Sequence, residues 1–344
     1  MPNNKIIAFD SLRVFAIFSV IVLHASAEIF VNSFPTHNWN VSNIYDSFSR
    51  WNVAVFFMIS GALFLRSSKE LSIKKLYSKN VLRIVIVFLF WSFIYAMNIP
   101  SVRCNIKYIF LELFSDQPYH FWFLKTLIGL YIAIPIYKLI VSNKKMEIYF
   151  LILAFIFGII IPSLFPFARV INEPFEGYLV SVYEDFNIEL ASTYSFYFVA
   201  GHFLIEYPIK NTYKRLLYTL GAISPFIVII LTYFVSHIND KAFVAFYGNE
   251  FICTAFEALA IFVLFINSSK INKYSHYFSK LSNYVLGIYI VHILVMYILS
   301  DFGLNPDSYN AAFFIPIYSI IVFAISFIFV ALLKRIPYVN KWIV

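Results

Sequence analysis

The chain has 344 residues, of which only 13% are charged, 61% are hydrophobic and 21% are aromatic. A soluble domain averages about 25% charged residues, and its surface needs polar cover that this composition does not supply. The composition therefore excludes a soluble enzyme, a disordered chain and a nucleic-acid-binding domain, and it indicates a lipid bilayer as the main solvent. The net charge of +8 is then expected to come from basic loops beside a membrane rather than from a nucleic-acid interface.

Ten apolar segments of membrane-spanning length follow one another along the chain, since a transmembrane helix needs about 20 mostly apolar residues. The expected helices cover residues 12–32, 48–66, 81–99, 121–141, 148–166, 190–207, 216–236, 250–268, 283–300 and 313–333. The longest connection is the acidic stretch 167–189. The first segment continues through a histidine and has no small-residue cleavage pattern, so we expect a retained helix and not a signal peptide. We predict an all-α, polytopic membrane bundle of about ten transmembrane helices.

The basic residues alternate between loops in a way that sets the orientation. Eighteen of the 26 Lys and Arg residues lie in one alternating set of loops, five lie in the other set, and the remaining three lie at helix ends. Lys and Arg in short loops stay on the cytoplasmic side. The pattern therefore predicts that both termini are cytoplasmic.

The first expected helix carries three ionisable residues along one stripe. Arg13 and His24 are 11 residues apart, which places them about 20° from the same face and about 16 Å apart along the axis. Asp10 precedes Arg13 by three residues, a spacing that allows the two to pair. Taken alone, Arg13 is explained equally well as a snorkelling anchor. For His24, a structural interhelical hydrogen bond is the less favoured explanation, because a histidine at this depth is costly. Their shared face favours a functional site, because ionisable groups at membrane depth are costly.

Four other polar or aromatic residues are candidates for substrate binding. His120 and Trp122 lie at the outer end of the segment 121–141, where an interfacial aromatic belt is the alternative explanation. Tyr289 and His292 are three residues apart on one face of the segment 283–300, and a structural role is equally compatible with them. Arg83 opens the segment 81–99 on the cytoplasmic side, where a basic anchor is common.

Several further features have structural explanations. Lys125 lies in an outer helical turn, where snorkelling accounts for it. The small pair Ser60-Gly61 is explained by close helix packing. His202 and Glu257 are expected to be buried and to pair with neighbouring groups. The two cysteines, Cys104 and Cys253, match no disulfide or metal-site spacing. The chain has no HExxH, GxSxG, Walker or GxGxxG motif, so we expect no metal and no permanently bound cofactor.

Arg13-x10-His24, in a first helix that begins FDSLR, resembles the acyltransferase-3 family of membrane acyltransferases. The resemblance covers essentially the whole chain, and four further elements carry it in the expected order: FFMISG (56–61), the basic segment ending in Arg83, HFWFLKTLIGLY (120–131) and GIYIVH (287–292). The segment 79–85, KNVLRIV, is less basic than the usual run of the family. With no appended hydrolase-like domain expected, the chain is most similar to stand-alone members that modify surface polysaccharides.

The resemblance implies a single integral membrane acyltransferase domain over residues 1–344, in a multi-pass protein of the bacterial cytoplasmic (inner) membrane. It implies transfer of an acyl group, commonly acetyl, from acyl-CoA as donor substrate to a hydroxyl of a cell-surface polysaccharide or lipid-linked glycan. His24 matches the essential histidine of the family, Arg13 the essential arginine and Asp10 the acidic residue ahead of it. We expect the anionic donor near Arg13 and Arg83, whose guanidinium groups suit phosphate.

Two forms of the chemistry and two rival functions remain open from the sequence. His24 either deprotonates the acceptor hydroxyl directly or carries the acyl group itself. The first rival is a transporter or a flippase for a polysaccharide or lipid-linked sugar; the nine glycines and the lack of an internal repeat weigh against it, whereas Pro162 and Pro225 interrupt helices as in transporters. The second is a membrane subunit without chemistry, which leaves the Arg13–His24 face unexplained.

Overall fold

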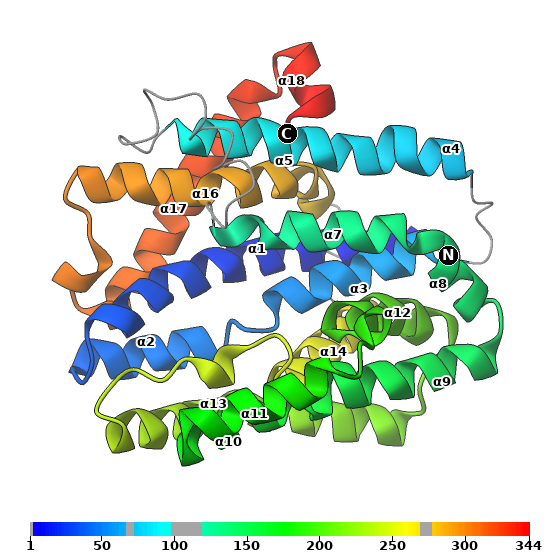
Figure 1. The fold of residues 1–344 in the computed structure, drawn as a ribbon. Coiled ribbons are helices and arrows are strands. Elements are labelled where there is room, and N and C mark those ends of the chain that lie inside the picture. The colour runs from blue at the N-terminus through cyan, green and yellow to red at the C-terminus, as the bar shows by residue number, and fades with distance from the viewer. Residues whose placement is uncertain (1–2, 67–71, 98–118, 269–276) are drawn as a thin grey trace.

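The computed structural model describes residues 3–66, 72–97, 119–268 and 277–344, and within these ranges the chain is helical and contains no β-strand (Figure 1). The α-helices are α1 (Asn3–Asn32), α2 (His37–Ser47), α3 (Asn52–Phe64), α4 (Ile73–Lys75), α5 (Leu82–Ala96), α7 (Trp122–Ile132), α8 (Ile134–Val141), α9 (Lys144–Phe155), α10 (Phe165–Ile171), α11 (Glu173–Glu184), α12 (Thr193–Glu206), α13 (Asn211–Ile238), α14 (Ile252–Asn267), α16 (Val285–Asp301), α17 (Ala311–Leu333) and α18 (Pro337–Trp342). The π-helical segments are η1 (Leu76–Val81) and η3 (Ile156–Ile160), and the 3-10 segments are η2 (Tyr119–Phe121), η4 (Pro162–Leu164), η5 (Glu189–Ala191), η6 (Ala245–Tyr247) and η7 (Pro306–Ser308).

Seven helical stretches of the described residues are long and apolar enough to cross a membrane. They are Ala8–Asn32, His37–Phe64, Ile73–Ala96, Lys144–Ile171, Asn211–Ile238, Ala245–Asn267 and Ala311–Leu333. The pair Tyr119–Ile132 and Ile134–Val141 makes an eighth if it forms one bent span. Each of the ten segments expected from the sequence contains a helix, but α12 has 14 residues and Val285–Asp301 has 17, which are short for a span. A count of ten spans and the side of the termini stay predictions.

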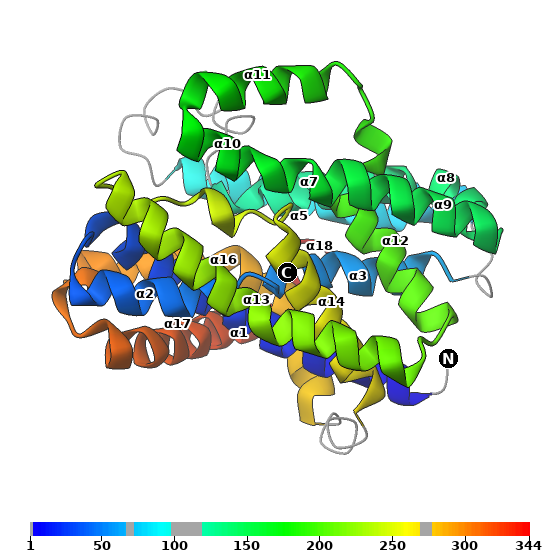
Figure 2. The same ribbon diagram turned by 90° about the horizontal axis from the view of Figure 1, so that it is seen from below.

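Local sequence explains where the helices break. The expected helix 121–141 is divided into α7 and α8, bent by 59°, because Pro135 lies in the first turn of α8 and cannot continue the hydrogen bonds of α7. The stretch 167–189, expected as a connection, is largely helical. Its helix α11 begins after Asn172, whose side chain accepts a hydrogen bond from the backbone N–H of Phe175. Figure 2 shows α11 on the outside of the bundle, beside α10.

The helix α1 crosses the middle of the molecule and packs against α2, α3, α14, α16 and α17 (Figures 1 and 2). Next to it, α3 and α12 approach very closely. A Cβ atom added at Gly61 of α3 would lie 1.6 Å from the carbonyl oxygen of Phe198, and one added at Gly201 of α12 would lie 2.0 Å from that of Met58. Both glycines are therefore needed for the contact of these helices. The Ser60-Gly61 pair has the packing role that the sequence suggested, while Ser60 also faces a cavity described below.

Candidate active site

The first turns of α1 place an acidic and a basic side chain together. Nη1 of Arg13 lies 3.2 Å from Oδ1 of Asp10, which is the pairing that the i, i+3 spacing predicted. Asp10 also accepts hydrogen bonds from the hydroxyls of Ser279, at 3.0 Å, and Ser282, at 2.8 Å. These serines precede α16, so Asp10 joins the start of α1 to the start of α16. The carboxylate holds the guanidinium group in place on one side and leaves its other nitrogens available to a ligand.

Arg13 lines a cavity of about 370 Å³ between α1, α3, α5, α7 and α16. The polar groups of the lining are concentrated near Arg13 and the start of α5, whereas most of the remaining wall is apolar. The lining residues are Arg13, Phe56, Ile59, Ser60, Lys79, Asn80, Arg83, Ile84, Phe123, Leu127, Tyr131, Ser282, Asn283, Val285, Leu286 and Tyr289. An apolar cavity of this size with a few convergent polar groups is typical of a small-molecule site. We call it the inner cavity.

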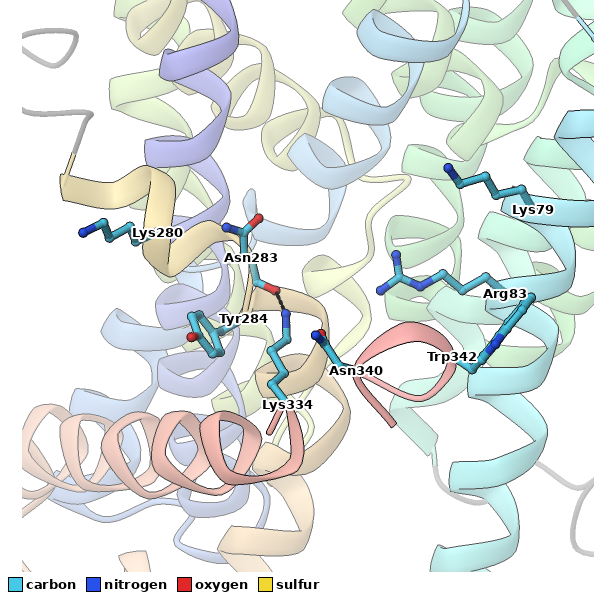
Figure 3. Close-up of a pocket in the computed structure, with 8 residues that line it drawn as sticks. All are labelled: Lys79, Arg83, Lys280, Asn283, Tyr284, Lys334, Asn340 and Trp342. Atoms are coloured by element: carbon cyan, nitrogen blue, oxygen red, sulfur yellow. Dashed lines mark hydrogen bonds between the residues drawn. The ribbon is translucent and has the colours of Figure 1, made fainter. Parts of the chain in front are cut away.

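A second, larger pocket of about 880 Å³ shares Lys79, Arg83 and Asn283 with the inner cavity. Figure 3 shows its lining side chains, which come from η1 and α5, from the segment before α16, from the end of α17 and from α18: Lys79, Arg83, Lys280, Asn283, Tyr284, Lys334, Asn340 and Trp342. Four of these eight residues are cations and none is acidic. We call this space the basic pocket. Its composition favours an anionic ligand with an aromatic or apolar part.

Two cations of the basic pocket are held by backbone oxygens. Nζ of Lys334 donates to the carbonyl of Asn283 at 2.6 Å, as drawn in Figure 3. Burial and, after it, the charge of Arg83 lower the pKa of Lys334 below its usual range. Arg83 itself donates through Nη2 to a main-chain carboxyl oxygen of Val344, the last residue of the sequence, at 2.9 Å. Lys334 has no carboxylate partner among the described residues, so its charge is available to a phosphate.

His24 lies in a cluster of histidines and tyrosines deeper along α1. Its Nδ1 is 3.3 Å from the hydroxyl of Tyr119, and its ring centroid is 5.2 Å from that of His292. The ring of His292 is in turn 5.3 Å from that of His120. The structure therefore brings together three histidines from α1, η2 and α16 that are 95 and more residues apart. We call them the histidine cluster.

Tyr289 connects the histidine cluster to the inner cavity. Its ring lines the inner cavity, and the same ring lies 5.7 Å from that of His292 and 5.8 Å from that of His120. Its hydroxyl donates to the backbone carbonyl of His120. Of the candidate residues, Arg13, Arg83 and Tyr289 thus line one cavity system. His120 and His292 contact Tyr289, and His24 contacts His292, but none of the three histidines is among the lining residues.

The remaining polar candidates lie elsewhere. Trp122 packs on Tyr194 of α12, with ring centroids 5.3 Å apart, and makes no ring contact with the histidine cluster in the described residues. His202 is buried, with Nδ1 2.7 Å from Oε1 of Glu147, so that local pairing accounts for it. Glu257 is 3% exposed. In the part of the chain that the structure describes, no group of His, Cys, Asp and Glu side chains has the arrangement of a metal site.

Sequence reasoning missed part of the basic pocket and of the cluster. Lys334 is one of the eighteen basic residues counted for orientation, and the sequence gives no signal that places it or Trp342 in a ligand site. Tyr119 directly precedes His120, yet nothing in its position indicates a contact with His24. Ser279 and Ser282 reach Asp10 across nearly the whole length of the chain, and a sequence pattern gives no signal for such a contact.

Comparison with known proteins adds one finding. A family model described as an acyltransferase domain matches residues 6–331, a range that includes Asp10, Arg13, Arg83 and all three residues of the histidine cluster. No curated protein and no solved structure is significantly similar to the chain. The match therefore covers the cavity system, except for Lys334 and α18 at its outer edge.

Proposed function

The chain belongs to the acyltransferase-3 family and is a membrane acyltransferase, and from this premise we propose a donor, an acceptor and a direction of transfer. The acyl group, acetyl in the first instance, comes from cytoplasmic acyl-CoA. It is delivered to a hydroxyl of a cell-surface polysaccharide or lipid-linked glycan on the opposite side of the membrane. The protein is a multi-pass component of the bacterial cytoplasmic membrane.

The observation that carries this proposal is the order of two adjoining pockets and the histidine cluster, each with a different chemistry. The basic pocket and the inner cavity share the lining residues Lys79, Arg83 and Asn283. Tyr289 lines the inner cavity and contacts His292, and His292 contacts His24. A ligand with an anionic head, a long uncharged arm and a reactive carbonyl could place its head in the basic pocket, its arm in the inner cavity and its carbonyl near the histidine cluster.

Acyl-CoA has that order of parts. Its nucleotide carries the phosphates, and Arg and Lys side chains recognise phosphate by charge and by hydrogen bonds. Arg83, Lys79 and Lys334 are therefore assigned to the nucleotide end of the donor. Arg13, fixed by Asp10, is assigned to the polar groups where the arm enters the inner cavity. The thioester then lies on the Tyr289 side, facing the histidine cluster.

His24 is proposed as the residue that performs the transfer. A neutral imidazole is a suitable base or nucleophile near neutral pH. In one form, His24 removes the proton of the acceptor hydroxyl, which attacks the thioester. In the other, His24 attacks the thioester and carries the acyl group to the acceptor. His120, Trp122, Tyr289 and His292 remain the proposed contacts of the acceptor or of the acyl group.

The test is the composition of the cell-surface glycan in cells with and without the gene. We expect the deletion strain to lose the mass of one acetyl group per modified sugar, and a plasmid copy to restore it. A copy carrying His24→Ala should not restore it, because the reacting nitrogen is gone. A copy carrying His237→Ala, an exposed histidine of α13, serves as the matched control. Full acetylation with His24→Ala, at equal amounts of protein in the membrane, would contradict the proposal.

A further inference from the structure

His292 occupies the centre of the histidine cluster. It is completely buried, and its ring lies 5.2 Å from the ring of His24 and 5.3 Å from that of His120. It comes from the same turn of α16 as Tyr289, the residue that closes the inner cavity. A polar side chain in this position is costly unless it is paired or used.

The hydrogen bonds of the cluster fix the tautomer of His292. Its Nδ1 lies 2.6 Å from the backbone oxygen of Tyr289. A carbonyl oxygen accepts only, so Nδ1 must carry the hydrogen, and in the neutral ring Nε2 holds a lone pair. Nε2 is buried and has no hydrogen-bond partner among the described residues. His292 therefore carries an unpaired, buried basic nitrogen in a ring whose centroid is 5.2 Å from that of His24.

The neighbouring histidine differs in one respect. His120 has its Nε2 3.4 Å from the backbone oxygen of Ile290, which leaves its Nδ1 unpaired in the same way. Among the described ring pairs, however, the ring of His120 contacts the ring of His292 and does not contact the ring of His24. The bond from Tyr289 to the His120 carbonyl and the bond from Tyr95 to the Ile290 carbonyl at 2.8 Å hold η2, α5 and α16 together. Of the two rings that carry an unpaired nitrogen, that of His292 is the one in contact with the ring of His24 among the described ring pairs.

Acyl transfer through His24 requires a second base, and this inference rests on the proposed function. A histidine that carries an acyl group has one nitrogen blocked, and the acyl group withdraws electrons from the other. It is then a poor base for the incoming hydroxyl, whose proton must leave as its oxygen attacks. We propose that Nε2 of His292 takes this proton, so that His24 is the acyl carrier and His292 the general base.

The two steps balance as follows. In the first, a nitrogen of His24 attacks the thioester carbon, the C–S bond breaks, and the thiolate leaves with the proton that the imidazole of His24 gives up. In the second, the acceptor oxygen attacks the acyl carbon while its proton moves to Nε2 of His292. The C–N bond then breaks, and His292 returns the proton to the released ring of His24. Both histidines end neutral, and no further reactant is needed.

The two steps can be measured separately with purified protein in lipid nanodiscs. Exchange of labelled free CoA into acetyl-CoA reports the first step without an acceptor. Transfer of labelled acetyl to washed membranes, as the source of native glycan, reports both steps. For His292→Gln we expect exchange to stay within about tenfold of the wild type and transfer to fall about 10²- to 10⁴-fold, the usual contribution of a general base. His24→Gln should lose both.

His237→Gln is the matched control, because His237 donates Nδ1 to the carbonyl of Tyr233 at 2.8 Å in the same manner but lies exposed on α13. If His292→Gln does not fold, His292→Ala with added imidazole replaces it, and imidazole should restore transfer. Normal transfer by a folded His292 variant, or loss of exchange together with transfer, would overturn the proposed base. Transfer without exchange in the wild type would overturn the relay but leave the acyltransferase proposal intact. Absence of both activities in the wild type would overturn the proposed function itself.

Discussion

Single residues in the basic pocket show how a ligand site is distinguished from a set of surface charges. Lys334 and Arg83 face one space whose lining residues include no Asp or Glu, and Lys334 is held by a backbone carbonyl rather than by an acid. Surface cations usually find acidic neighbours or project into solvent. The lining supplies four cations and no acidic side chain, so a bound phosphate would interact with these cations directly.

Lys334 gives this site a dependence on pH. Its pKa is lowered by burial and by Arg83, so as the pH rises it loses its charge earlier than an ordinary lysine. A cation binds phosphate only below its pKa, and the affinity for the donor should therefore fall toward alkaline pH. In the wild type, the KM for acetyl-CoA should therefore rise toward alkaline pH. We expect this rise to be smaller in Lys334→Arg, because arginine keeps its charge. The measurement is KM against pH for both proteins.

Lys280→Arg is the control for this experiment, since Lys280 lines the same pocket and the exchange adds the same guanidinium group. It should leave the wild-type dependence unchanged. An identical alkaline rise in the wild type and in Lys334→Arg would show that Lys334 does not contact the donor.

At the same scale, the sequence predicted local pairs and not distant ones. The Asp10–Arg13 pair followed from a spacing of three residues on a helix. The two serines that complete the site of Asp10 come from the segment before α16. Their approach depends on how α1 and α16 pack, which is a property of the folded bundle.

At the scale of elements, the close contact of α3 and α12 is set by two glycines. Gly61→Ala should force the helices apart, since the new Cβ would lie 1.6 Å from a backbone oxygen that has no freedom to rotate away. Overpacking of this kind typically costs about 1–3 kcal/mol. We expect a clear drop in the thermal unfolding temperature in detergent, together with reduced activity because Ser60 and Phe56 of α3 line the inner cavity.

Gly129→Ala in α7 is the matched control. No atom lies within 4 Å of a Cβ placed at this glycine, and alanine favours a helix over glycine by about 1 kcal/mol. This variant should unfold at the same temperature as the wild type or slightly above it. Equal losses in both variants would show that the α3–α12 contact is not the cause.

The helices themselves were largely predictable, but not all of their irregularities were. Long apolar runs indicate a helix whatever its neighbours, and each of the ten expected segments contains one. The division of 121–141 has a signal in Pro135, although one continuous helix was expected there. The π-helical turn η1, which carries Lys79 into both pockets, has no such signal in the sequence. Helix α11 was missed because its pattern is that of a surface helix, apolar on one face and acidic on another, rather than that of a membrane span.

At the scale of the whole molecule, the candidate site has two separate parts, the basic pocket and the histidine cluster, with the inner cavity between Arg13 and Tyr289. The basic pocket is formed by the ends of α17 and α18, by the segment before α16 and by η1. His24 lies further along α1 than Arg13, in contact with His292. Such an arrangement would allow a donor that stays on one side of the membrane to serve an acceptor on the other. The sequence predicted the separation of Arg13 and His24 from their 11-residue spacing on one helix, and the structure adds a cavity that extends from Arg13 to Tyr289, a ring neighbour of His292.

The most direct test uses inside-out membrane vesicles, in which the cytoplasmic face is outermost and the native glycan is inside. Labelled acetyl-CoA is added outside, and the label on the glycan is then tested for protection from an esterase that does not cross the membrane. The account predicts that label appears on the glycan, resists the esterase until detergent is added, and is absent with His24→Ala. Label that the esterase removes without detergent, or equal labelling by His24→Ala, would contradict transfer across the membrane through His24.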